Sequence, residues 1–141
     1  MSPLFSRNKR TGNIRHILLF LLLAMPGAVN AGEEVEKTIF LVNEHDRVVA
    51  VNAETGQFFD FILSAKERIQ QRFVANGVAI LVTNQRFAGV GIYPSGWISM
   101  RRKAQEKVLS TEVEDRSAVL VTSDRILTFS SKSGVWSETR R

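Results

Sequence analysis

The sequence of 141 residues contains no cysteine, so no disulfide bond can hold the fold together. It also lacks the parts of a nucleophilic active site: there is no Gly-x-Ser-x-Gly turn, and His45 is the only histidine after residue 31. One histidine between two carboxylates in a turn offers too few ligands for a metal site, which usually gathers three or four. We therefore expect no metal, no cofactor and no enzyme activity.

An excess of positive charge is confined to the N-terminus. Of the 19 Lys and Arg residues, four (Arg7, Lys9, Arg10 and Arg15) precede an apolar run at residues 17–25. The other 15 stand against 14 Asp and Glu, so the rest of the chain is close to neutral. A nucleic-acid-binding domain needs a basic stripe on its folded surface. We therefore expect no nucleic-acid partner.

Residues 1–31 have the order of parts of a secretory signal peptide: basic residues, an apolar run and a helix break, with Val29 and Ala31 as small residues before a cleavage site. Nine apolar residues at 17–25 make about 14 Å of helix, roughly half of a bilayer core. We expect cleavage after Ala31. The product, residues 32–141, would be one domain in the periplasm or outside the cell, without a stable membrane anchor.

One sequence motif occurs three times, as LVNEHDRVVAV from Leu41, LVTNQRFAGV from Leu81 and LVTSDRILTF from Leu120. Matching residues lie 39 apart, as in Arg47, Arg86 and Arg125; Val51, Val90 and Phe129; Phe58, Trp97 and Trp136; Glu67 and Glu106. The turn at residues 44–46 is interpreted as holding one extra residue. So many matches at one spacing indicate an internal repeat.

Each repeat unit is expected to form four short strands, typified by residues 79–83, 86–93, 97–102 and 106–113. Turn residues recur at short intervals and no stretch has a helical period, so the predicted fold is all-β. The units are predicted at residues 38–77, 78–116 and 117–141. Because the third unit ends after its aromatic strand, we expect it to lack a fourth strand.

The first unit, FLVNEHDRVVAVNAETGQFF from Phe40, is similar to a blade of the quinoprotein-like β-propellers, through the phrase Asp-x-Val-x-Ala-x-x-Ala-x-Thr-Gly that starts at Asp46. The resemblance implies a propeller-like series of four-stranded meanders, each about 39 residues long. It does not extend to quinone binding, because the residues for that chemistry are missing.

Three units are too few for a ring of blades, which normally needs at least four. Two chains could close a six-bladed ring as a homodimer with two-fold symmetry. Another protein could complete an open series of sheets. The alternative is closure about a pseudo-three-fold axis, as in β-trefoils and β-prisms.

The repeated arginines are the main candidates for ligand binding. Arg47, Arg86 and Arg125 each follow a tight turn, and a guanidinium group can bind carboxylates, phosphates or sulfated sugars through paired hydrogen bonds. They could equally pair with Glu67 and Glu106, which also recur at the repeat spacing.

The repeated aromatic position, Phe58, Trp97 and Trp136, has two interpretations. A ring of such residues, with Trp97 and Trp136 as its binding candidates, could stack on sugars. The same residues could instead form the contacts by which each unit packs on its neighbour.

These observations favour an exported, non-catalytic binding or interaction module whose partner is a protein or a glycan. A second hypothesis is a small hydrolase that uses the carboxylates Glu106 and Glu112, which would then lie close together with raised pKa values. A third is a structural subunit of an envelope assembly.

Overall fold

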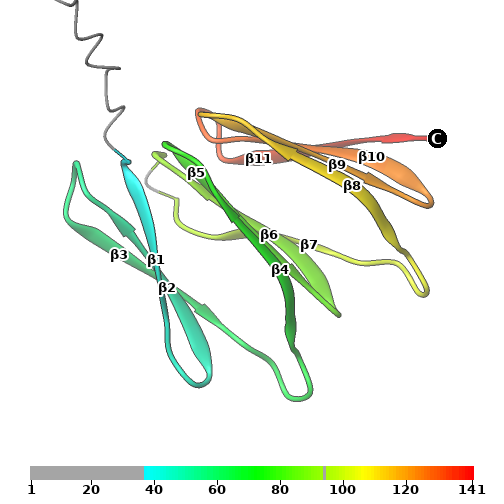
Figure 1. The fold of residues 1–141 in the computed structure, drawn as a ribbon, viewed down its shortest axis with the longest axis horizontal. Helices are drawn as coiled ribbons and strands as arrows, with labels where there is room; N and C mark the ends of the chain where they lie inside the picture. Colours follow the sequence, from blue (N-terminus) through cyan, green and yellow to red (C-terminus); the bar gives the residue numbers. More distant parts are fainter. Residues whose placement is uncertain (1–36, 94) are drawn as a thin grey trace, which may run out of the picture. The chain divides into compact units, whose positions relative to one another are not determined.

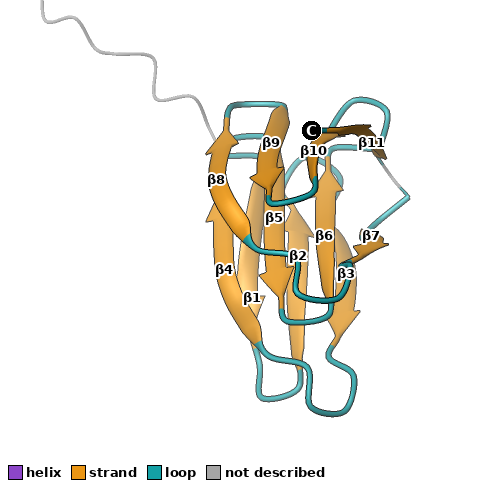
Figure 2. Cartoon of the chain, turned by 90° about the vertical axis from the view of Figure 1, so that its right-hand side faces the viewer, coloured by secondary structure: helices purple, strands orange, loops and turns teal. Residues whose placement is uncertain are grey.

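The computed structural model describes residues 37–93 and 95–141, and all of them fall in one unit, Glu33–Arg141. These residues form strands, turns and loops without a helix (Figure 2). The predicted all-β fold is therefore confirmed. The signal peptide expected at residues 1–31, with cleavage after Ala31, lies outside the described residues.

The strands form three antiparallel sheets in chain order (Figure 1). Sheet 1 contains β1 (Ile39–Asn43), β2 (Arg47–Asn52) and β3 (Gln57–Ile62). Sheet 2 contains β4 (Ile69–Val74), β5 (Val78–Thr83), β6 (Arg86–Gly91) and β7 (Ile98–Arg101). Sheet 3 contains β8 (Val108–Val113), β9 (Ser117–Thr122), β10 (Arg125–Ser130) and β11 (Val135–Arg140). Within each sheet, consecutive strands are neighbours.

The fourth strand of each of the first two predicted units belongs to the next sheet along the chain. β4 pairs with β5 and β8 pairs with β9, in both cases across a tight turn. The longer linkers, residues 63–68 and 102–107, instead connect one sheet to the next. Residues 117–141 thus contain three strands, as expected for the third unit, but β8 gives sheet 3 its fourth strand. Among the described residues it is sheet 1 that has only three strands.

The strand register also corrects the prediction of an extra residue in the turn at 44–46. Equivalent first pairs in the three sheets are Ile39 with Asn52, Val78 with Gly91, and Ser117 with Ser130. Both members advance by 39 each time, so the spacing holds throughout and Glu44 occupies the position of Thr83. Aligning the repeated letters Leu-Val shifted β1 by one residue, and in a strand a one-residue shift exchanges the two faces.

Sheet 2 is buried on both faces, which explains the uninterrupted apolar sequence of β5. One face packs on sheet 3 through a cluster that contains Val78, Ile80, Val82, Phe87, Ala118, Leu120, Leu127 and Phe129. The other face packs on sheet 1 through clusters that contain Ile39, Val48, Ala50, Phe61, Ala79, Leu81, Ala88 and Val90. No buried cluster of the described residues joins sheet 1 to sheet 3. Closure about a pseudo-three-fold axis, which requires that contact, is therefore not observed.

Candidate functional site

A buried ion pair lies where sheet 3 meets the linker from sheet 2. Arg125, the first residue of β10, donates from Nε to Glu106 Oε1 at 2.9 Å and from Nη2 to Glu106 Oε2 at 3.1 Å. Thr122 Oγ1 donates to the same carboxylate at 2.8 Å. The Arg125 side chain is only 6% exposed and the Glu106 side chain is fully buried. Two parallel hydrogen bonds between opposite charges, shielded from water, fix both side chains.

Sheet 2 carries the same cluster. Arg86 donates from Nε and Nη2 to the two carboxylate oxygens of Glu67, at 2.8 Å and 3.1 Å, and Thr83 Oγ1 donates to Glu67 at 2.7 Å. Here the arginine side chain is 28% exposed, so the pair is partly open to solvent. Of the two interpretations of the repeated arginines, pairing with glutamate therefore describes Arg86 and Arg125.

The environment of Glu106 lowers its pKa. Burial alone would raise the pKa, but hydrogen bonds from Arg125, the Lys103 amide and Thr122, with the charge of Arg125, outweigh burial and lower it to about 2. The same balance lowers the pKa of Glu67. The hydrolase hypothesis expected a raised pKa at Glu106, and that expectation was wrong: an ionised carboxylate cannot donate a proton near neutral pH.

Stability should therefore depend on pH through Glu106. Its folded pKa, about 2, is below the usual value of 4.5 for a glutamate, so its contribution is present above pH 4.5 and is lost as the pH falls toward 2. The full shift corresponds to about 3 kcal/mol. We predict that the free-energy difference between the wild type and Glu106→Gln, measured by urea unfolding, shrinks between pH 4.5 and pH 2. A difference that is constant over this range would contradict the assignment.

Arg47, the third repeated arginine, has a different environment. It donates to Glu44 at 2.5 Å and to Asp60 at 3.2 Å, and its side chain is 41% exposed. The hydrogen bond from Arg47 lowers the pKa of Glu44. The position 39 residues before Glu67 is residue 28, which lies outside the described residues. The three arginines thus share a position in the repeat but not a set of partners.

Trp97 and Trp136 connect sheets through their indole groups. Trp97 Nε1 donates to Phe59 O and Trp136 Nε1 donates to Ile98 O, both at 2.9 Å. Each acceptor belongs to the last strand of the preceding sheet, Phe59 to β3 and Ile98 to β7. The rings lie at a tilt against Phe61 and Phe129, with centroids 5.4 Å and 5.1 Å apart. These contacts match the packing interpretation of the two tryptophans.

A broad cavity of about 870 Å³ opens beside the middle sheet, where the turn between β5 and β6 faces the linker after β7. Its lining is Ser64, Asn84, Gln85, Arg86, Ser99, Arg101, Arg102, Lys103, Ala104 and Gln105. Four of these residues are basic and none is acidic. Ser99 was not a candidate from the sequence, although its repeat equivalents Asp60 and Glu138 are both carboxylates.

The described part of the chain contains no group of three or more His, Cys, Asp or Glu residues arranged to hold a metal ion. Within the same residues, no helix has the length and apolar character needed to cross a membrane. The candidates for a functional site among the described residues are therefore the basic cavity, the arginine clusters and the sheet faces.

The described residues thus form three consecutive antiparallel sheets that are related by an internal repeat. The chain matches no model of a known protein family and no curated protein. Among solved structures it is similar to the N-terminal domain of Nup159, with 12% identity and a TM-score of 0.42. The match covers 74% of this chain and 28% of that chain. A similarity at this level transfers neither fold nor function.

Proposed function

We propose that the chain is an exported, non-catalytic interaction module and that its partner is a second copy of itself. In this proposal the second copy packs on the free face of sheet 1 and continues the propeller-like series of sheets. The observation that carries the proposal is the exposure of Phe58, whose repeat equivalents Trp97 and Trp136 both contact a preceding sheet.

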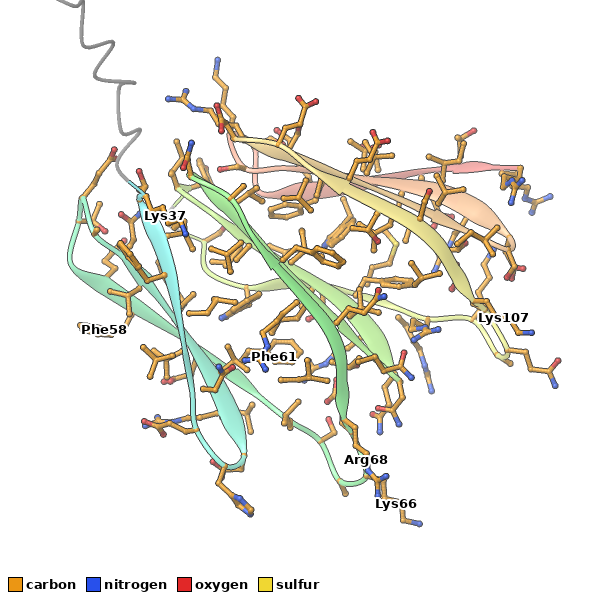
Figure 3. The ribbon with its side chains drawn as sticks, viewed as in Figure 1. Lys37, Phe58, Phe61, Lys66, Arg68 and Lys107 are labelled. Atoms are coloured by element: carbon orange, nitrogen blue, oxygen red, sulfur yellow. The ribbon has the colours of Figure 1, made fainter. Side chains whose placement is uncertain are left out.

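The face of sheet 1 that points away from sheet 2, called its free face because no other described strand covers it, is mostly apolar, with Arg47 and its partners Glu44 and Asp60 beside the apolar residues. Alternation along its strands places Phe40, Val42, Val49, Val51, Phe58 and Ile62 on the side away from sheet 2. Phe58 is 69% exposed and Ile62 66%, and Figure 3 shows Phe58 and Phe61 on opposite sides of β3. Contiguous apolar surface of this kind on a soluble domain marks an interaction site.

The repeat indicates which surface would cover this face. Arg86 Nη2 donates to Ile62 O at 2.6 Å and Arg125 Nη2 donates to Arg101 O at 2.8 Å, so each reaches the last strand of the preceding sheet. Arg47 Nη2, at the same repeat position, has no acceptor among the described residues. The equivalent acceptor beyond sheet 1 would be Arg140 O on β11 of a second copy.

The outer face of sheet 3 can provide that surface. Its residues are the repeat equivalents of those by which sheet 1 packs on sheet 2 and sheet 2 packs on sheet 3. They include half-buried Val119, Val121 and Ile126 among Ser and Thr residues. Glu112 on β8 is its only acidic residue in the described strands. Two copies joined head to tail at both ends would form a ring of six sheets with two-fold symmetry.

The test is the solution mass of the purified protein by light scattering over a tenfold concentration range. We expect a dimer that Phe58→Asp and Thr128→Glu each convert to a monomer, because Thr128 is exposed on the outer face of sheet 3. Tyr93→Asp is the control, since Tyr93 is 48% exposed and follows β6 of sheet 2, which provides neither of the two proposed faces. A monomer at every concentration would overturn the proposal. A dimer sensitive to Phe58→Asp but not to Thr128→Glu would overturn the head-to-tail arrangement.

A further inference from the structure

The three repeated arginines differ in the partner of one guanidinium nitrogen, Nη1. In sheet 1, Arg47 Nη1 donates to Asp60 Oδ1 at 3.2 Å. In sheet 3, Arg125 Nη1 donates to Glu138. Both carboxylates occupy the same repeat position, on the strand paired with the arginine's strand. In sheet 2 that position holds Ser99, opposite Ala88 in the pairing of β6 with β7.

Arg86 is nevertheless held as firmly as its equivalents. Its Nε and Nη2 are bound to Glu67 and Ile62 O, and its guanidinium carbon lies 4.0 Å from the centre of the Phe61 ring. Nη1 has no acceptor within residues 37–93 and 95–141. A fixed guanidinium group with a free donor binds an anion with little further loss of side-chain freedom.

The surroundings of Arg86 favour an anionic ligand. Arg101 and Lys103 line the same cavity and form no ion pair with any described residue. Arg102 is held in place by its hydrogen bond to Thr83 O at 2.7 Å. Of the four basic residues that line the cavity, only Arg86 forms an ion pair with a described residue, Glu67, and no carboxylate lines the cavity, so its surface carries net positive charge.

We propose that this cavity binds an acidic saccharide whose carboxylate accepts a hydrogen bond from Arg86 Nη1. The ligand carboxylate would take the place that Asp60 and Glu138 occupy in the other two sheets. A saccharide fits better than an acidic peptide because hydroxyl and amide side chains, those of Ser64, Ser99 and Gln105, complete the lining. The cavity lies apart from the free face of sheet 1, so the proposal stands independently of self-association.

The sharpest variant supplies the missing carboxylate from within the chain. Ser99→Glu recreates the pairing of Arg125 with Glu138, and the new side chain should occupy the donor that the ligand needs. Ser99→Gln is the matched control, since it has the same bulk without the charge. By calorimetric titration with a short galacturonic acid oligomer, we expect Ser99→Glu to lose at least about tenfold in affinity and Ser99→Gln much less.

Two other probes separate the possible sources of the anion. The neutral galactose oligomer and an oligoglutamate peptide should both bind at least about tenfold more weakly than the acidic saccharide. Unchanged affinity in Ser99→Glu would overturn the proposal. So would equal affinity for the neutral sugar or a preference for the peptide. Phe58→Asp should bind the saccharide as the wild type does, which keeps failure of this site distinct from failure of the dimer.

Discussion

Replacing Glu106 with Gln should lower the free energy of unfolding by about 3–5 kcal/mol, as expected when one partner of a buried ion pair is removed. Gln preserves the shape of the side chain but leaves the guanidinium group of Arg125, which is 6% exposed, without its main counter-charge. Arg125 also donates to Arg101 O and so connects sheet 3 to sheet 2. The measurement is urea unfolding at neutral pH, with a lower midpoint and an unchanged slope as the expected result.

The matched control is Glu67→Gln in the equivalent cluster of sheet 2. Because the Arg86 side chain is 28% exposed, water can solvate the unpaired guanidinium group, and we expect a loss of about 1–2 kcal/mol. The comparison holds the chemistry constant and varies the burial of the arginine. Equal losses at the two sites would mean that burial of the arginine does not determine the cost.

The repeat and the all-β fold could be predicted from the sequence. Matching residues that lie 39 apart indicate the repeat, and turn residues at short intervals without a helical period indicate strands. The strand partners could not be predicted. A stretch such as residues 106–113 reads as a strand in isolation, but the length of the connection on each side decides its neighbour. The tight turn between β8 and β9 brings those strands together, while the linker before Glu106 crosses to another sheet. Sequence units and structural sheets therefore begin at different residues.

The candidate site was predictable in part. The pairing of Arg86 with Glu67 and of Arg125 with Glu106 was one of two interpretations of residues that recur at one spacing, and the structure shows both contacts. The special position of Arg86 depends on Ser99, and sequence alone does not show that residues 13 apart face each other. Only the pairing of β6 with β7 identifies Ser99 as the residue that lacks the carboxylate of its equivalents.

The contact between Gly89 and Phe129 gives the second large expected effect. A methyl group at Gly89 would lie 2.7 Å from two atoms of the Phe129 ring, well inside van der Waals contact. The ring is fully buried and lies against Trp136, so it has little room to move. We predict that Gly89→Ala lowers the free energy of unfolding by about 1–3 kcal/mol, the usual cost of overpacking a core. Urea unfolding measures it.

The interface between sheets 1 and 2 shows how the clash can be relieved. There the same two repeat positions are occupied by Ala50 and Val90, which pack in one buried cluster. Phe129→Val alone should cost about 3 kcal/mol because it leaves a cavity. Combined with Gly89→Ala it recreates the Ala50 and Val90 pair, so the double variant should be more stable than the sum of the single losses by about 1–2 kcal/mol. Strictly additive losses would show that the two interfaces are not built on the same packing rule, even though their residues are related by the repeat.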